Sequence, residues 1–182
     1  MTFADDLRAE GEPEKEFHAG IAGRLPRKRV SGGAFLRRES GELLVVVPTY
    51  KPGWEIPGGL CEENEGPLAA CTREVREELG LDVVLGNLLV VDWVPRHGVW
   101  VDALHFIFDG GFITDEAVRA FRLQAEEIQA VKLAHLSEVE KHVRPSMARR
   151  LHSATDAAAR GETLYLEFGR QRDGDDVAAS GS

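Results

Sequence analysis

The segment between residues 59 and 81 constrains this chain more than any other. Glu74, Glu77 and Glu78 fall within little more than one helical turn, behind paired glycines and ahead of Gly80. Like charges on one helix repel, and each pair spaced four residues apart costs about 0.2–0.5 kcal/mol. A helix that carries this cluster needs a compensating partner, and a divalent cation with oxygen ligands is the obvious candidate.

The ends of this helix can be predicted from Pro67 and Gly80. Proline suits the first helical turn and glycine suits the position just past the end, so the sequence predicts a helix over 67–79. At about 100° per residue the three glutamates border the apolar face, with the small Ala70 one turn before Glu74. The predicted buried stripe consists of Leu68, Cys71, Val75 and Leu79.

The rest of the chain alternates between strand and helix patterns. Residues 30–38 and 42–50 flank Glu39-Ser40-Gly41 and predict a hairpin. Residues 81–95 and 99–111 predict two long antiparallel strands. The later predictions are a helical turn after Thr114, a strand at 130–136, a helix capped by Ser137, a helix over 145–160 and a strand at 163–168.

A length of 182 residues is sufficient for one domain with a full core. Residues 1–29 are polar at first and then basic, and we interpret them as an N-terminal arm with at most a short helix. The domain itself is expected over residues 30–168. Residues 169–182 have the composition of a disordered tail.

Composition excludes several classes of partner. The net charge of −9 argues against a nucleic-acid polymer, which requires a basic face. No apolar run approaches the ~20 residues of a membrane span, and the acidic N-terminus lacks the pattern of a signal peptide. We therefore expect a cytoplasmic protein that does not bind membranes. Cys61 and Cys71 are expected to be reduced thiols, the second of them in the core.

The segment resembles the signature of the Nudix hydrolases, G-x5-E-x7-R-E-U-x-E-E-x-G-U, where U is a bulky aliphatic residue. Every fixed position is matched, by Gly59, Glu65, Arg73, Glu74, Val75, Glu77, Glu78, Gly80 and Leu81. The order of the flanking elements extends the likeness to roughly residues 30–150. The resemblance implies an α/β/α sandwich with a mixed central sheet, and hydrolysis of a nucleoside diphosphate linked to another moiety.

The resemblance also implies roles for the motif residues. Glu74, Glu77 and Glu78 would bind magnesium or manganese, with the Gly59 carbonyl as a further ligand. Glu65 and Arg73 would form a structural pair, and Gly80 would end the helix. Such cations withdraw charge from the phosphates and activate water, which is the chemistry that a diphosphate ester needs. The alternative is a solvated helix face in which Arg73 and Glu77 form an i,i+4 pair.

The general base and the substrate contacts are open at this level. Glu77 could act as the base, and so could Glu126 or Glu127 on a later loop, which could equally be surface residues. The candidate substrate contacts are Arg37, Lys51, Trp93, Arg96 and Trp100, although aromatic residues on strands usually belong to the core. His97 and His105 are expected to pack or to face solvent.

Three functions remain in view. The first is a pyrophosphohydrolase acting on a nucleotide sugar such as ADP-ribose, because family members with that substrate often carry a proline near the position of Pro95. The second is a nucleoside triphosphate pyrophosphatase of the house-cleaning type. The third is a non-catalytic nucleotide sensor, which is disfavoured because such proteins usually lack some of the motif glutamates. A homodimer is also possible.

Overall fold

The structure, a computed structural model, describes residues 3–10, 12 and 15–172. In these residues a sheet of seven strands has the order β6-β2-β1-β5-β4-β7, and β3 pairs with β1 beside it. The elements are α1 (Phe3–Ala9), the 3-10 helix η1 (Ala22–Arg24), β1 (Arg29–Arg37), β2 (Leu43–Pro48), β3 (Gly58–Leu60), α2 (Pro67–Leu79), β4 (Leu88–Val94), β5 (Ala103–Phe112), α3 (Asp115–Arg119), β6 (Ile128–Ala134), α4 (Leu136–Val139), α5 (Pro145–Arg160) and β7 (Leu164–Glu167).

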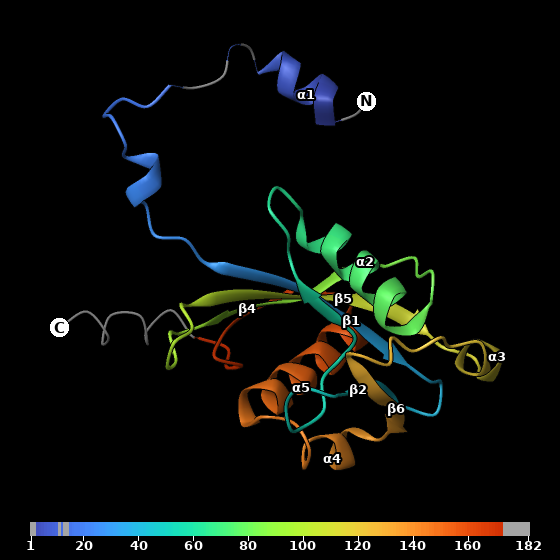
Figure 1. Cartoon of the computed structure of the whole chain (residues 1–182). Coiled ribbons are helices and arrows are strands. Elements are labelled where there is room, and N and C mark those ends of the chain that lie inside the picture. The colour runs from blue at the N-terminus through green and yellow to red at the C-terminus, as the bar shows by residue number, and fades with distance from the viewer. Residues whose placement is uncertain (1–2, 11, 13–14, 173–182) are drawn as a thin grey trace.

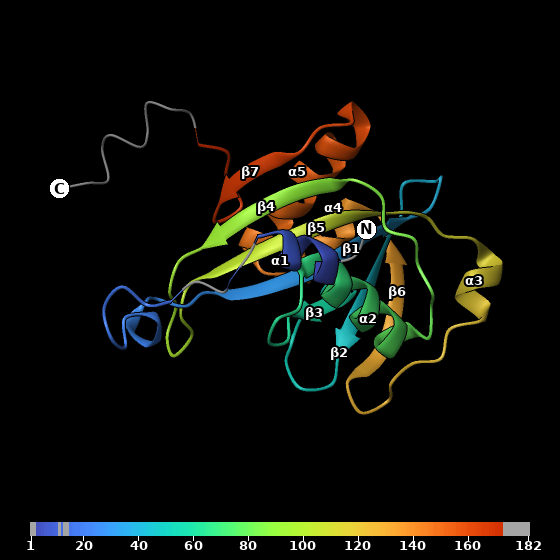
Figure 2. The same cartoon turned by 90° about the horizontal axis from the view of Figure 1, so that it is seen from above.

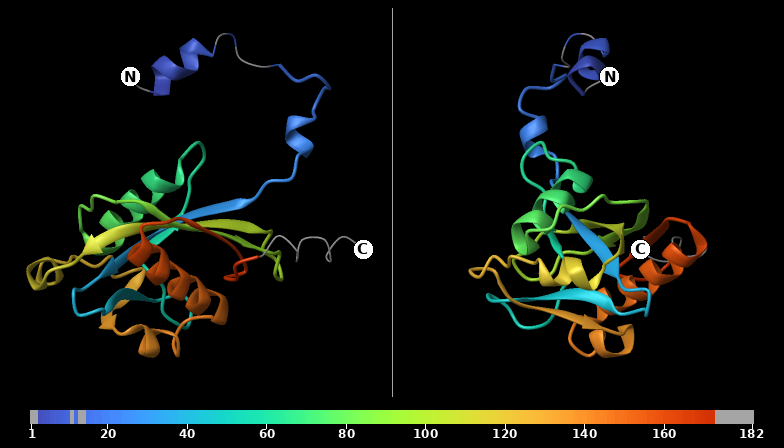
Figure 3. Two further views of the ribbon diagram at one scale, coloured as in Figure 1. Left: turned by 180° about the vertical axis from the view of Figure 1, so that it is seen from behind. Right: turned by 90° about the vertical axis from the view of Figure 1, so that its right-hand side faces the viewer.

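The sheet is mixed and is covered on both faces. β1 pairs with β5 in parallel, as does β4 with β7, whereas the other pairs are antiparallel. α2 lies on one face, and α4 and α5 lie on the other (Figures 1 and 3). The expected α/β/α sandwich with a mixed sheet is confirmed.

Alternation along the strands divides the core between the two faces. On β1, Ala34 and Leu36 pack with Val75 of α2, whereas Phe35 packs with Leu151 of α5. All five side chains are at most 3% exposed. The same strand therefore anchors both helical layers.

β1 changes its antiparallel partner along its length. Its first half pairs with β3, with Gly32 opposite Gly59, and its end pairs with β2 through Arg37 and Leu43. The connection between β2 and β3 is held to the sheet by backbone hydrogen bonds between Val46 and Glu55. This change of partner brings the glycine-rich β3 beside the start of α2.

Glycines allow α2 to lie directly on β1. A Cβ added to Gly32 would come within 2.1 Å of the Pro67 carbonyl oxygen and 2.9 Å of the Cys71 Cβ atom. On the neighbouring strand Gly58 has φ +136°, and a Cβ there would come within 2.2 Å of the Gly32 oxygen. Only glycine fits at positions 32 and 58 without moving the helix or the strand.

A buried ion pair fastens α5 to the sheet. Arg150 Nη2 lies 2.6 Å from Asp92 Oδ2 on β4, and both side chains are at most 5% exposed. The second carboxylate oxygen accepts a hydrogen bond of 2.9 Å from the backbone N–H of Gly169. The chain that follows β7 is thus held to the core by the same carboxylate.

The N-terminal arm and the tail are predicted from composition alone. α1 and η1 lie apart from the sheet in the side views (Figures 1 and 3), whereas α1 overlaps the sheet in the view from above (Figure 2). The boundary at residue 30 remains a proposal. The tail expected from residue 169 lies outside the described residues from residue 173 onward. No helix in the described part of the chain is long and apolar enough to span a bilayer.

Most predicted elements are confirmed, including the helices over 67–79 and 145–160, but several details were wrong. β4 begins only at Leu88, and residues 95–102 form a longer β4–β5 connection because Val94 already pairs with Ala103. α4 begins one residue before Ser137, so that serine is not its cap. Leu68 is 49% exposed, because side chains of a first helical turn point back past the helix end.

The contact between α2 and β1 can be tested by filling it. Gly32→Ala should lower the free energy of unfolding by about 1–3 kcal/mol, because a methyl group at this site must push the helix off the strand. Urea unfolding at neutral pH measures the change. Gly23→Ala is the matched control, since a Cβ there meets nothing within 4 Å. Equal unfolding midpoints for the two variants would contradict this account.

Candidate active site

Arg73 of α2 joins the loop before the helix to the carboxylates of its second half. Its Nε and Nη2 atoms lie 3.0 and 2.9 Å from the two carboxylate oxygens of Glu65. Nη1 donates to Glu74 at 2.9 Å and to Glu77 at 3.0 Å. Nη2 also donates to the Leu60 carbonyl at 3.1 Å. One guanidinium thus contacts three glutamates.

This ion pair fixes the charges of both partners. The hydrogen bond from Arg73 lowers the pKa of Glu65 to about 2, and the backbone N–H of Glu62 adds to this effect. In return, the hydrogen bond to Glu65 raises the pKa of Arg73 above its usual range. The pair is therefore ionised throughout the physiological range of pH.

Glu74 lies against the backbone of β3. A Cβ added to Gly59 would come within 2.3 Å of the Glu74 carboxyl carbon, so a side chain at position 59 would displace this carboxylate. Burial raises the pKa of Glu74, although the hydrogen bond from Arg73 opposes that effect. Gly59 is therefore required for the close approach of a carboxylate to a backbone segment.

Glu78 is the most deeply buried of the three glutamates, with 7% of the residue exposed. Its Oε2 atom accepts a hydrogen bond of 2.9 Å from the backbone N–H of Gly58. Burial raises its pKa to about 8, and the charges of Glu74, Glu127 and Glu55 act in the same direction. A buried carboxylate among like charges gains most from a bound cation.

The two glutamates of the later loop differ in their electrostatic effect on these carboxylates. The segment before β6 packs on the end of α2, where the N–H groups of Arg122 and Gln124 donate to the carbonyls of Leu79 and Glu78. The charge of Glu127 is among the main causes that raise the pKa values of Glu74 and Glu78, and Glu126 is not among those main causes.

Gly80 ends α2 where that segment passes. It has φ +65°, and its N–H donates to the Arg76 carbonyl at 2.9 Å. A Cβ at this position would meet the Arg122 side chain at 3.0 Å. Gly80 thus allows the loop that carries Glu127 to approach the helix.

The structure brings together Gly59, Glu65, Arg73, Glu74, Glu77 and Glu78. The last three of these form the acidic cluster of the site. Sequence reasoning gave no role to Glu55, whose charge acts on Glu78 and which pairs with Lys51 at 2.7 Å. Its only sequence signal was its position just before the Pro-Gly-Gly turn.

The candidate substrate contacts are dispersed. Lys51 is connected to the acidic cluster through Glu55, whereas Arg37 pairs with Asp109 at the far end of β1. Trp93 donates its indole N–H to Asp102, and Trp100 and Arg96 are exposed on the β4–β5 connection. Among the described residues, these last three share no hydrogen bond or ion pair with the acidic cluster.

The donor atoms of the cluster suit a hard cation. Carboxylates and a backbone carbonyl are the ligands that magnesium and manganese prefer, and the buried Glu78 lacks a cationic partner among the described residues. No three acidic, histidine or cysteine side chains in the described ranges stand close enough together to hold a metal. Glu74 and Glu77 are instead paired with Arg73, at 2.9 and 3.0 Å.

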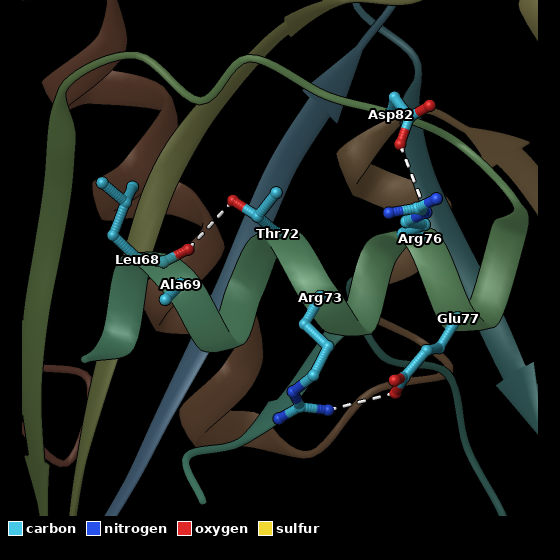
Figure 4. Close-up of a pocket in the computed structure, with 7 residues that line it drawn as sticks. All are labelled: Leu68, Ala69, Thr72, Arg73, Arg76, Glu77 and Asp82. Carbon is cyan, nitrogen blue, oxygen red and sulfur yellow. Dashed lines mark hydrogen bonds and ion pairs between the residues drawn. The ribbon is translucent and has the colours of Figure 1, made fainter. Parts of the chain in front are cut away.

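The outer side of α2 carries an open depression of about 780 Å³ (Figure 4). It is lined by Leu68, Ala69, Thr72, Arg73, Arg76, Glu77 and Asp82. Glu77 is half-exposed at its edge, whereas Glu74 and Glu78 lie on the side of the helix that faces the sheet. The acidic cluster therefore extends from the side of α2 that faces the sheet to the side that faces solvent.

Comparison with known proteins identifies relatives along part of the chain. The human diphosphoinositol polyphosphate phosphohydrolase 3-alpha is 41% identical over 70 residues, which are 37% of this chain and 43% of the relative. The 8-oxo-dGTP diphosphatase of Proteus vulgaris is 53% identical over 47 residues, or 24% of this chain and 42% of the relative. The chain thus spans less than half the length of these curated relatives.

The fold is shared with solved structures at low sequence identity. The NUDIX domain of Shewanella oneidensis NrtR, in complex with ADP ribose, aligns with a TM-score of 0.61 and 16% identity, covering 87% of this chain and 99% of that one. The model of the NUDIX domain matches residues 27–154. Because this match covers well over half of the chain and includes the whole motif, the chain belongs to the Nudix family.

Proposed function

We propose that this chain is a metal-dependent pyrophosphohydrolase that cleaves a nucleoside diphosphate linked to another moiety, most suitably a nucleotide sugar such as ADP-ribose. The observation that carries the proposal is the position of the Glu74 carboxylate against Gly59, beside the buried Glu78. This arrangement places two carboxylates against neighbouring residues of β3, and a cation that binds a diphosphate requires such oxygen donors.

Glu74, Glu77, Glu78 and the Gly59 carbonyl would hold magnesium or manganese. When bound, such a cation withdraws charge from the phosphates and makes water a better nucleophile. Because Arg73 pairs with Glu74 and Glu77, cation binding competes with that guanidinium for the two carboxylates. Glu65 keeps Arg73 charged and in place while this exchange occurs.

Glu127 is the better candidate for the general base. It is exposed, and its charge is among the main electrostatic influences on two members of the acidic cluster, Glu74 and Glu78. In this role Glu127 accepts a proton from the water that attacks phosphorus, and the other phosphate departs with the bond electrons. Glu77 is the alternative base, although it is already engaged by Arg73.

Two relatives support different substrates. The NrtR domain, which shares the fold, was solved with ADP ribose, and this supports a nucleotide sugar. The relative from Proteus vulgaris acts on 8-oxo-dGTP, and its high local identity supports a nucleoside triphosphate as the second candidate. The products separate the two, because only a triphosphate substrate releases pyrophosphate as it forms the monophosphate.

The metal role of Glu77 can be tested by Glu77→Gln. We expect turnover to fall at least a hundredfold with magnesium or manganese, while the unfolding midpoint changes little, because the side chain is half-exposed. Product analysis over nucleotide sugars, nucleoside triphosphates and dinucleoside polyphosphates gives the activity. Glu63→Gln, on the exposed loop before α2, is the control. Full activity in Glu77→Gln would refute the metal assignment, and ligand binding without turnover by the unmodified chain would favour a sensor.

The general base can be tested with neighbouring glutamates. Glu127→Gln should lower kcat by about 10²–10⁴-fold, because the attacking water loses its proton acceptor. Glu126→Gln is a matched control, because the residue is adjacent and also exposed. If both variants retain the activity of the unmodified chain, Glu77 becomes the candidate base.

Glu78 should make the stability of the metal-free protein depend on pH. Its pKa is about 8 in the folded state and about 4.5 when unfolded, so between these values the folded chain holds the extra proton. Stability from this group is therefore full below pH 4.5 and is lost as pH rises toward 8. In the presence of a chelator, Glu78→Gln should become more stable relative to the unmodified chain as pH rises. Parallel curves of unfolding free energy against pH would contradict the prediction, and magnesium should stabilise the unmodified chain more than Glu78→Gln at pH 8.

A further inference from the structure

A second group of polar side chains lies on the face of the sheet toward α5. Ser31 of β1 stands opposite His105 of β5, and Ser31 Oγ lies 2.5 Å from His105 Nδ1. Arg29 is two residues before Ser31 and so shares its face, as does Phe35, which packs with the α5 side of the core. Arg29, Ser31 and His105 together form the polar row of this face.

The polar row has unused hydrogen-bonding capacity. Within the described residues no group bonds to Nε2 of His105, and this atom is not among the buried polar atoms that lack a partner. Nε2 is therefore accessible from solvent. Burial and the charges of Arg150, Arg29 and Lys51 lower the pKa of His105 to about 3, so the ring is neutral. With Nδ1 bonded to Ser31, the free Nε2 acts as a donor or as an acceptor, depending on the tautomer.

Arg29 and Arg149 are half-buried and lack a carboxylate partner among the described residues, and Arg149 bonds to the Phe168 carbonyl. The half-buried Arg37 and Arg73 and the buried Arg150 each pair with a carboxylate. Arg29 instead donates from Nε to the Val101 carbonyl at 3.2 Å and lies 5.0 Å from the ring centroid of Trp100. No carboxylate in the described part of the chain forms an ion pair with it, although the chain is strongly acidic. A half-buried guanidinium without an acidic partner suits an electron-rich ligand.

The pairing of β1 with β3 brings the polar row near the acidic cluster. Ser31 stands opposite Leu60 of β3, and the neighbouring Gly59 lies against the Glu74 carboxylate. A ligand whose diphosphate lies at the acidic cluster can therefore extend across β3 toward the row.

We propose that the polar row binds the hydroxyl-bearing sugar attached to the diphosphate. The neutral His105 and the Ser31 hydroxyl exchange hydrogen bonds with sugar hydroxyls, and Arg29 donates to their oxygens. The row thus selects what is attached to the diphosphate, whereas the acidic cluster acts on the anhydride. This inference rests on the proposed function, because it takes the position of the diphosphate from it.

Ser31→Ala and His105→Gln test the row in the full chain with magnesium. With ADP-ribose as the probe, each variant should raise KM about five- to tenfold, as expected for the loss of one hydrogen bond to a ligand, and change kcat less than twofold. Inhibition by ADP, which ends at the diphosphate, should be unchanged. Thermal unfolding checks that both variants fold, and the removal of a single hydroxyl in Ser31→Ala makes it the safer of the two.

Matched controls are Ser137→Ala and His152→Gln, which alter the same residue types on α4 and on the outer side of α5. A KM within twofold of the unmodified chain in both row variants overturns the inference, as does a fall in kcat at constant KM. If the unmodified chain hydrolyses nothing, the proposed function fails by itself. Calorimetric titration with ADP-ribose then decides the row: weaker binding by both variants supports it, and equal or absent binding overturns it.

Discussion

The close contact between α2 and β1 is the constraint on which the rest of the site depends. Backbone atoms of β1 touch the helix directly, because position 32 has no room for a Cβ atom. A helix held at this distance cannot shift to relieve repulsion among its glutamates. The energy of that repulsion is instead offset by Arg73 and by the backbone N–H that Gly58 supplies to Glu78. The packing of α2 on β1 thus fixes the positions of the glutamates, and the hydrogen bonds from Arg73 and Gly58 compensate their charge.

Arg73 gives the site two electrostatic states. Without a cation its guanidinium neutralises part of the charge of Glu74 and Glu77, so the folded chain tolerates an acidic helix. A divalent cation would take over that task, and Glu65 would retain Arg73. In the proposed site the same residue would therefore stabilise the fold and set the affinity for metal, because a stronger hold on Glu77 would weaken cation binding by the same free energy.

The sequence allowed the prediction of features that depend on neighbours along the chain. Pro67 and Gly80 placed the helix ends correctly, and the motif placed the glutamates on its border. Features that depend on contacts between residues far apart in the sequence could not be predicted. Examples are the change of partner along β1, the ion pair of Asp92 with Arg150 and the pairing of Ser31 with His105, because no local pattern records which strands become neighbours. Leu68 was misplaced because helical periodicity alone does not take into account that side chains of a first helical turn point back past the helix end.

The contact between Asp92 and Gly169 shows where the folding unit ends. The family match stops at residue 154, inside α5, but the Asp92 carboxylate binds Arg150 with one oxygen and the N–H of Gly169 with the other. A chain cut at the end of the family match would leave one buried carboxylate oxygen without a donor and expose the edge of β4 that β7 covers. The family match and the folded unit of this protein thus end at different residues. A shortened chain that keeps the fold has to include Gly169.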